Sequence, residues 1–223
     1  MRTSLKRSGA GRRVANAALA VAVALVLIPR LAHAQLTATK LDAPPPEEIA
    51  APIRGLLTPA ARVAAGAATL EFWFVSSLPA GGASDWSQVA EGTVVGAVRV
   101  AGAFKEIRGK TVKPGAYTLR LGLQPQNGDH LGVSPFREYL LLSPAAVDKD
   151  AKPLGFEGTV ALSKQTLGAS HPAALSLDPP VATGAPLSTV TSELDHRGVV
   201  FEVKTAAGSP LRFGLILIGL IEH

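Results

Sequence analysis

Short runs of alternating apolar and polar residues, separated by turns rich in Gly and Pro, recur along most of the chain. Such alternation places every second side chain on one face and is typical of half-buried β-strands. The ranges with this pattern or with a high content of β-branched and aromatic residues are 69–76, 93–100, 104–107, 116–123, 136–142, 187–194, 199–205 and 211–221. The sequence therefore predicts a mainly β fold, an antiparallel β-sandwich with one or two short helices.

Two segments have helical rather than alternating spacing. Apolar residues between positions 49 and 57 fall on one side of a short helix, which Pro52 is expected to kink or break. Residues 155–168 favour the longer helix, with Gly168 as its terminator. The apolar side chains Phe156, Val160 and Leu167 share one side of that helix.

The first 34 residues have the three parts of a secretory signal peptide. A basic stretch is followed by an uncharged apolar run, Val14 to Ile28, and then by the small-residue site Ala32-His33-Ala34. The apolar run is shorter than the roughly 20 residues that a membrane-spanning helix needs. We therefore expect cleavage before Gln35, a periplasmic or secreted mature protein, and no membrane span after cleavage.

The basic character of the whole chain comes mostly from this segment. Residues 1–34 hold six of the 22 Lys and Arg and none of the 17 Asp and Glu, which leaves 16 basic against 17 acidic residues and a net charge of −1. A nearly neutral chain gives no electrostatic support for binding nucleic acid or an anionic membrane. The sequence therefore predicts no nucleic-acid partner.

The remaining 189 residues are enough for one well-buried core. We expect a polar, flexible lead-in over residues 35–45 and a single β-sandwich domain over residues 46–223. The chain contains no Cys, which excludes disulfides, thiol catalysis and cysteine-bound metal. Stability must then come from packing and hydrogen bonds alone.

The segment PGAYTLRLGLQPQNGDHLGVSPFREYLLLSPAAVDKD, with SHPAALSL further on, resembles an uncharacterised family of exported bacterial proteins. The resemblance covers most of the mature chain and implies export and a β-sandwich fold, with no known activity. More loosely, the segment from Pro114 to Leu119 is similar to the Pro-Gly-x-Tyr strand of secreted prealbumin-like and carboxypeptidase-regulatory-like sandwiches. That shorter likeness implies a turn and a strand rather than a reaction.

Sequence signatures of catalysis are weak. The chain has no Gly-x-Ser-x-Gly elbow, phosphate-binding loop or dinucleotide fingerprint. Ser170 stands beside His171, and adjacent residues cannot easily aim an imidazole at the neighbouring hydroxyl. Carboxylates that a hydrolase could use are present without a pattern that pairs them: Asp85, Glu91, Asp129 and Glu138.

Histidines in expected loops suggest a metal site. His130 and His171 are the two candidate metal ligands, with Asp129 as an oxygen ligand or as an acceptor that orients a ring. Neutral imidazole suits zinc or copper. The alternative is that these rings donate hydrogen bonds that order their loops.

Taken together, these features favour an exported, non-enzymatic binding or structural module that recognises a protein or carbohydrate partner through long loops. Trp86, in a polar loop, is the candidate partner-binding aromatic. A zinc- or copper-binding periplasmic protein using loop histidines is the alternative, and a carboxylate-dependent hydrolase is the second. The sequence requires no cofactor.

Overall fold

The computed structural model describes residues 36–80, 85–126, 135–192 and 194–219. All of them belong to the compact unit His33–His223. Within this described part the chain is mainly β, with antiparallel sheets and two helices, α1 (Ala51–Arg54) and α2 (Gly155–Leu167), which confirms the predicted fold class. No helix of the described residues is long and apolar enough to cross a membrane.

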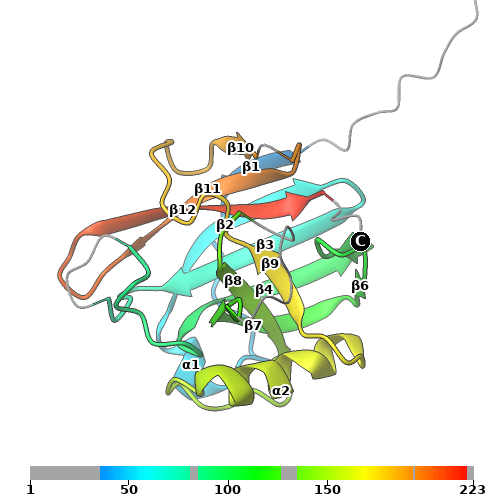
Figure 1. Cartoon of the computed structure of the whole chain (residues 1–223), viewed down its shortest axis with the longest axis vertical. Helices are drawn as coiled ribbons and strands as arrows, with labels where there is room; N and C mark the ends of the chain where they lie inside the picture. Colours follow the sequence, from blue (N-terminus) through cyan, green and yellow to red (C-terminus); the bar gives the residue numbers. More distant parts are fainter. Residues whose placement is uncertain (1–35, 81–84, 127–134, 193, 220–223) are drawn as a thin grey trace, which may run out of the picture. The chain divides into compact units, whose positions relative to one another are not determined.

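The larger sheet is antiparallel throughout, and the described residues contribute seven strands to it. In spatial order these strands are β1 (Leu36–Lys40), β2 (Leu57–Ala65), β3 (Ala68–Val75), β4 (Val94–Gly102), β7 (Gly115–Leu123), β8 (Glu138–Pro144) and β9 (Ala173–Ser176). Neighbours in this order are mostly neighbours in the sequence, so the sheet is largely a meander. Figure 1 shows the meander running from β1 toward α2.

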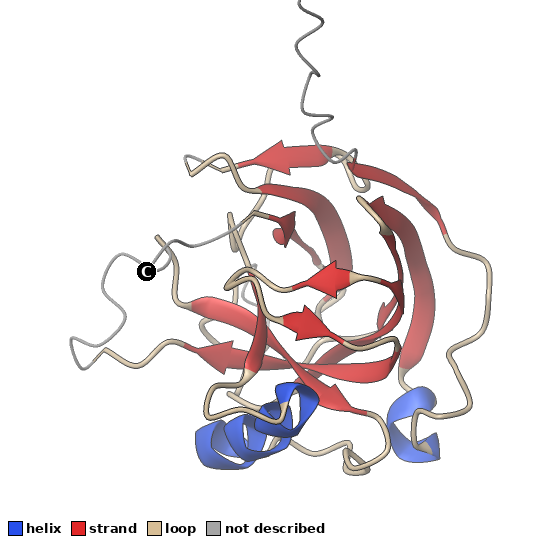
Figure 2. Ribbon diagram, turned by 90° about the vertical axis from the view of Figure 1, so that its right-hand side faces the viewer, coloured by secondary structure: helices blue, strands red, loops and turns tan. Residues whose placement is uncertain are grey.

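The C-terminal strands form a smaller antiparallel sheet, β10 (Thr189–Thr191), β11 (Arg197–Lys204) and β12 (Pro210–Ile218), as predicted. A further hairpin pairs β5 (Phe104–Lys105) with β6 (Thr111–Val112). A bridge between Leu177 and Leu215 joins the end of β9 to β12, so the two larger sheets meet along this line. Figure 2 shows the curved strands enclosing the interior, with the helices at one end.

Aromatic side chains from both larger sheets meet in the interior. Phe72 and Phe74 of β3 face Phe201 of β11, with ring centroids 5.0 Å apart in each pair. Phe213 of β12 lies edge-on to Phe74 at 5.5 Å. These rings are 0 to 2% exposed. Burial of such large apolar groups is the main stabilising contribution of the core.

Residues 36–40 form strand β1 rather than a flexible lead-in, which corrects the expectation for residues 35–45. Leu36 to Lys40 pair in register with Ala65 to Ala61 of β2. Leu41 is buried, and the Trp73 indole N–H donates to the Ala43 carbonyl at 2.7 Å. The segment looks polar because an edge strand with one solvent-facing side needs few apolar residues.

The predicted helix over residues 155–168 is confirmed, but its most buried side chains are not the predicted apolar ones. Gly168 ends α2 in the left-handed conformation, at φ 61°. The buried side chains are Thr159, Ser163 and Thr166, while Phe156 is 43% exposed. A surface helix usually packs its apolar side on the core. Here the buried positions hold hydroxyls, each of which donates to a backbone carbonyl, while Val160 and Leu167 pack on the protein as partly buried side chains.

Candidate functional site

An open, mainly apolar cleft of about 330 Å³ lies between α2 and the face of β7, β8 and β9 that is turned away from the aromatic core. We call it the α2 groove. Its lining residues are Ile107, Arg108, Gly122, Leu123, Gln124, Pro125, Tyr139, Leu141, Phe156, Val160, Lys164, Ser170, His171, Pro172 and Ala174. Ligand sites are commonly apolar clefts of about this size with a few polar groups.

The floor of the groove is formed by three adjacent strands. Gly122 of β7 lies opposite Tyr139 of β8, and Leu141 of β8 lies opposite Ala174 of β9. At Gly122 a β-carbon would come within 2.9 Å of the Leu141 side chain. Glycine therefore lets Leu141 lie down over β7. The Tyr139 hydroxyl makes a long hydrogen bond with Oε1 of Gln124, at 3.4 Å.

One wall is a side of helix α2. Phe156, Val160 and Lys164 follow one another at four-residue spacing, so they stack along one side of the helix. Val160 packs on the cluster of Tyr139 and Leu141. The large exposed fraction of Phe156 shows that the described protein leaves this wall partly uncovered.

The opposite wall is held by a partly buried ion pair in the turn between β5 and β6. The Arg108 guanidinium donates to Oε2 of Glu106 through Nε and Nη2, both at 3.0 Å. Glu106 is fully buried, and it also accepts the backbone N–H groups of Arg108 and Lys110. Arg108 donates as well to the carbonyl of Pro172. This contact fixes the chain next to His171.

The described lining residues of the groove carry a positive charge on balance. None of the described lining residues is Asp or Glu. Glu106 neutralises Arg108, whereas Lys164 forms no ion pair within the described part of the chain. His171 is exposed and also lines the groove. As far as the chain is described, the groove thus combines an apolar floor with one lysine that has no ion-pair partner.

The structure places His171 in this groove but does not test the predicted metal site. Asp129 and His130 lie outside the described residues, as does His223. His196 is buried, 5% exposed. Among the residues that are described, no three His, Asp or Glu side chains lie together as a metal cluster. The zinc or copper site at His130 and His171 stays a prediction.

Trp86 is not an exposed partner-binding residue, which corrects that expectation. Its side chain is 4% exposed and packs edge-on to Phe213, with ring centroids 5.3 Å apart. The indole N–H donates to the carbonyl of Pro180 at 2.7 Å. A loop of small polar residues folds over the aromatic core here, so the indole joins the core instead of facing solvent.

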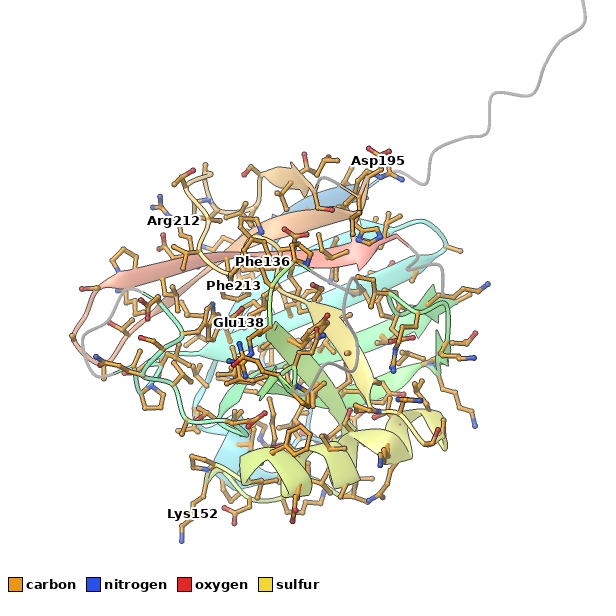
Figure 3. All side chains as sticks on the ribbon, in the orientation of Figure 1. Phe136, Glu138, Lys152, Asp195, Arg212 and Phe213 are labelled. Carbon is orange, nitrogen blue, oxygen red and sulfur yellow. The ribbon has the colours of Figure 1, made fainter. Side chains whose placement is uncertain are left out.

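A second concentration of polar groups, the Arg120 cluster, is closed to ligands. All five N–H groups of the buried Arg120 guanidinium are used: two by Asp148 and three by the carbonyls of Gly92, Asp150 and Lys152. Thr118 also donates to Asp148. The Lys152 side chain itself points away from the domain (Figure 3). A guanidinium with every donor used is a structural element.

Two of the carboxylates considered for hydrolysis accept backbone hydrogen bonds within the protein. Asp85 accepts hydrogen bonds from the side chain and backbone N–H of Ser87, which lower the pKa of the Asp85 carboxyl. Glu91 accepts the backbone N–H of Leu123 at 2.9 Å. Asp129 lies outside the described residues. The described part of the chain therefore offers no pair of carboxylates across the groove.

Of the groove residues, sequence reasoning identified His171 as a possible ligand-binding side chain and missed Gly122 and Lys164. The missed signal is the spacing of Phe156, Val160 and Lys164, which runs from apolar to cationic along one helix side. Comparison with known proteins adds nothing to this assignment: no protein-family model, no curated protein and no solved structure matches the chain.

Proposed function

We propose that this protein is a non-enzymatic binding module whose binding site is the α2 groove. The observation that carries the proposal is the uncovered apolar wall at Phe156 and Val160, facing an apolar floor. A helix that packs hydroxyls inward and leaves a phenylalanine outward has a free apolar side. Such surfaces commonly mark binding sites.

The groove favours an apolar partner group over a carbohydrate. Sugars are bound through many hydrogen bonds and through exposed aromatic faces, and Trp86 is buried in the core. The Tyr139 hydroxyl is engaged with Gln124, and Arg108 is engaged with Glu106. The remaining lining atoms are mainly hydrocarbon. An apolar group that excludes water from this surface gains the most binding free energy.

The polar groups at the rim support binding rather than catalysis. Ser170 and His171 are neighbours in the chain, and neither side chain hydrogen-bonds to another described residue. A nucleophile–base pair requires a hydrogen bond between the two groups and a third group that orients the base. The groove offers a cation and hydrogen-bond donors, which orient a ligand.

Binding of N-phenyl-1-naphthylamine, a neutral apolar dye, tests the proposal by fluorescence titration. The wild-type protein is expected to bind one dye molecule, and Phe156→Asp to bind it about fivefold more weakly, since covering half a phenylalanine ring is worth about 1 kcal/mol. Val181→Asp is the matched control, because Val181 is 48% exposed and lies outside the groove. Absence of binding, or equal weakening in both variants, contradicts the proposal.

Export belongs to the same proposal. The basic stretch, apolar run and Ala32-His33-Ala34 site support cleavage and a periplasmic or secreted location. The described residues from Leu36 onward form the paired strand β1, so a cleaved chain retains the sheet. Intact-mass measurement of exported protein is expected to give a chain that starts at Gln35. A mass that retains residues 1–34 contradicts it.

A further inference from the structure

We infer that the ligand of the α2 groove is a carboxylic acid of medium length, an unbranched apolar chain with one terminal carboxylate. The inference rests on the proposed function, because it names the class of ligand for the same groove. The juxtaposition that carries it lies within the described residues: a mainly apolar groove lined also by Lys164, which forms no ion pair with any of them.

The wall of α2 gives the ligand its direction and length. Phe156, Val160 and Lys164 lie on one side of the helix, and Lys164 follows Phe156 by eight positions, a rise of about 12 Å along the helix axis. A hydrocarbon chain lying along this wall contacts Phe156 and Val160. Its charged end then reaches Lys164. The same chain covers Tyr139 and Leu141 on the floor.

The charges around the groove favour a single negative charge. Arg108 is already matched by the fully buried Glu106, so its charge is not available in full to a ligand. Lys164 has no ion-pair partner in the described part of the chain, and no described lining residue is acidic. A monocarboxylate matches one lysine, whereas a cationic head group would face Lys164 without a counter-charge.

We expect His171, which also lines the groove, to supply a second contact to the carboxylate. It lines the groove on the segment that Arg108 holds through the Pro172 carbonyl. An imidazole N–H donates a hydrogen bond to a carboxylate oxygen whether or not the ring is charged. The two contacts orient the head group, and the apolar surface supplies most of the affinity.

Displacement of the neutral dye from the wild-type protein tests the head group directly. Decanoate, decanol and decyltrimethylammonium carry the same chain length and differ in charge. Decanoate is expected to displace the dye at a concentration about fivefold lower than decanol, the size of an effect from one partly exposed ion pair. Decyltrimethylammonium is expected to be weaker than decanol.

Lys164→Gln is expected to remove the preference for decanoate over decanol while dye binding persists. Lys113→Gln is the matched control, because Lys113 is exposed and lies outside the groove, and it is expected to keep the preference. Raising the salt concentration is expected to shrink the preference in the wild-type protein.

The outcomes separate the inference from the proposed function. If the dye does not bind, the proposed function fails. If the dye binds and decanoate is no better than decanol, or if Lys164→Gln keeps the preference, the carboxylate inference is overturned and the binding groove stands. If the dye binds and none of the three decyl compounds displaces it, the groove takes an apolar side chain of a partner protein, and the inference is overturned.

Discussion

Arg120 and Gly122 are two residues apart on β7 and lie on the same face of the sheet, yet one contributes to stability and the other to the candidate binding site. At Arg120 every donor has a protein acceptor, and the side chain is fully buried. At Gly122 there is no side chain, so Leu141 lies over the strand there, and both residues line the α2 groove. The closed position, Arg120, is filled by a fully bonded side chain, whereas the open position, Gly122, lies in the groove.

The contrast shows how α2 divides this face of the sheet. The segment before the helix, residues 148–152, wraps the Arg120 cluster and supplies three of its partners. The helix itself passes beside Leu141 and leaves Phe156 outward. Polar groups that satisfy one another hold the helix in place. Apolar groups that lack a cover remain for a ligand.

The largest expected effect comes from opening the closed position. Arg120→Met is expected to lower the free energy of unfolding by about 3–5 kcal/mol, because it leaves the Asp148 carboxylate buried without its counter-charge. Denaturant unfolding measures the change. Arg99→Met is the control: the Arg99–Glu48 pair is 42% and 60% exposed, so its loss is expected to cost less than about 1 kcal/mol. Equal effects of the two substitutions would remove the distinction between the closed and open positions.

An intermediate effect is expected from filling the open position. In Gly122→Ala the new β-carbon lies 2.9 Å from Cγ and Cδ1 of Leu141, so that side chain must move. Such overpacking costs about 1–3 kcal/mol, and a moved Leu141 also alters dye affinity. Gly55→Ala is the control, since its β-carbon would make ordinary contact with the Ala51 carbonyl at 3.4 Å. A variant with unchanged stability and unchanged dye affinity would show that Gly122 is not needed for the groove.

Tyr117 lies on the core face of the same strand and shows how burial affects an ionisable group that has no counter-charge. Burial raises the pKa of the Tyr117 hydroxyl above 10.0, and that hydroxyl donates to the Lys113 carbonyl at 2.7 Å. The folded state then keeps this proton at a pH where the unfolded state loses it, so stability is present below about pH 10 and falls as the pH rises further. Tyr117→Phe is expected to lower the free energy of unfolding by about 1 kcal/mol at pH 8. The stability of this variant is expected to fall less steeply above pH 10 than that of the wild type. Parallel pH profiles of wild type and variant would contradict this.

The smallest stability effect is expected at the uncovered wall. Phe156→Ala is expected to change the free energy of unfolding by less than about 0.5 kcal/mol, since the ring is half exposed and not part of the main core. The same substitution at Phe201, inside the aromatic core, is expected to cost about 3–5 kcal/mol. A large loss at Phe156 would make that ring structural and weaken its assignment to a ligand.

The helix over residues 155–168 shows both the strength and the limit of sequence patterns. Its C-terminal end follows from local chemistry, since Gly168 adopts the left-handed conformation that ends a helix. Its orientation depends on partners distant in sequence: Ser163 donates to the Ala173 carbonyl, and Thr166 donates to the Leu142 carbonyl. Apolar periodicity carries no information about such bonds.

Strands with regular alternation, such as β3 and β7, were predictable, whereas β1 and Trp86 were not. β1 reads as a polar linker because it is an edge strand, with Leu36 as its buried apolar side chain. Trp86 is buried by a contact with Pro180, which is 94 residues away in the chain. The groove likewise depends on contacts between distant parts of the sequence, since Gly122 and Lys164 line the same groove only in the folded chain.

The hydroxyls of α2 also determine how selective the groove can be. Hydrogen bonds have directional requirements, and turning the helix by one residue, about 100°, would carry Ser163 and Thr166 away from their carbonyl acceptors. A helix held only by apolar contacts can shift to accommodate ligands of different width, but a helix held by two directional hydrogen bonds cannot. The position of Phe156 relative to the sheet is therefore set before a ligand binds, and we expect an unbranched chain to fit the groove better than a branched one.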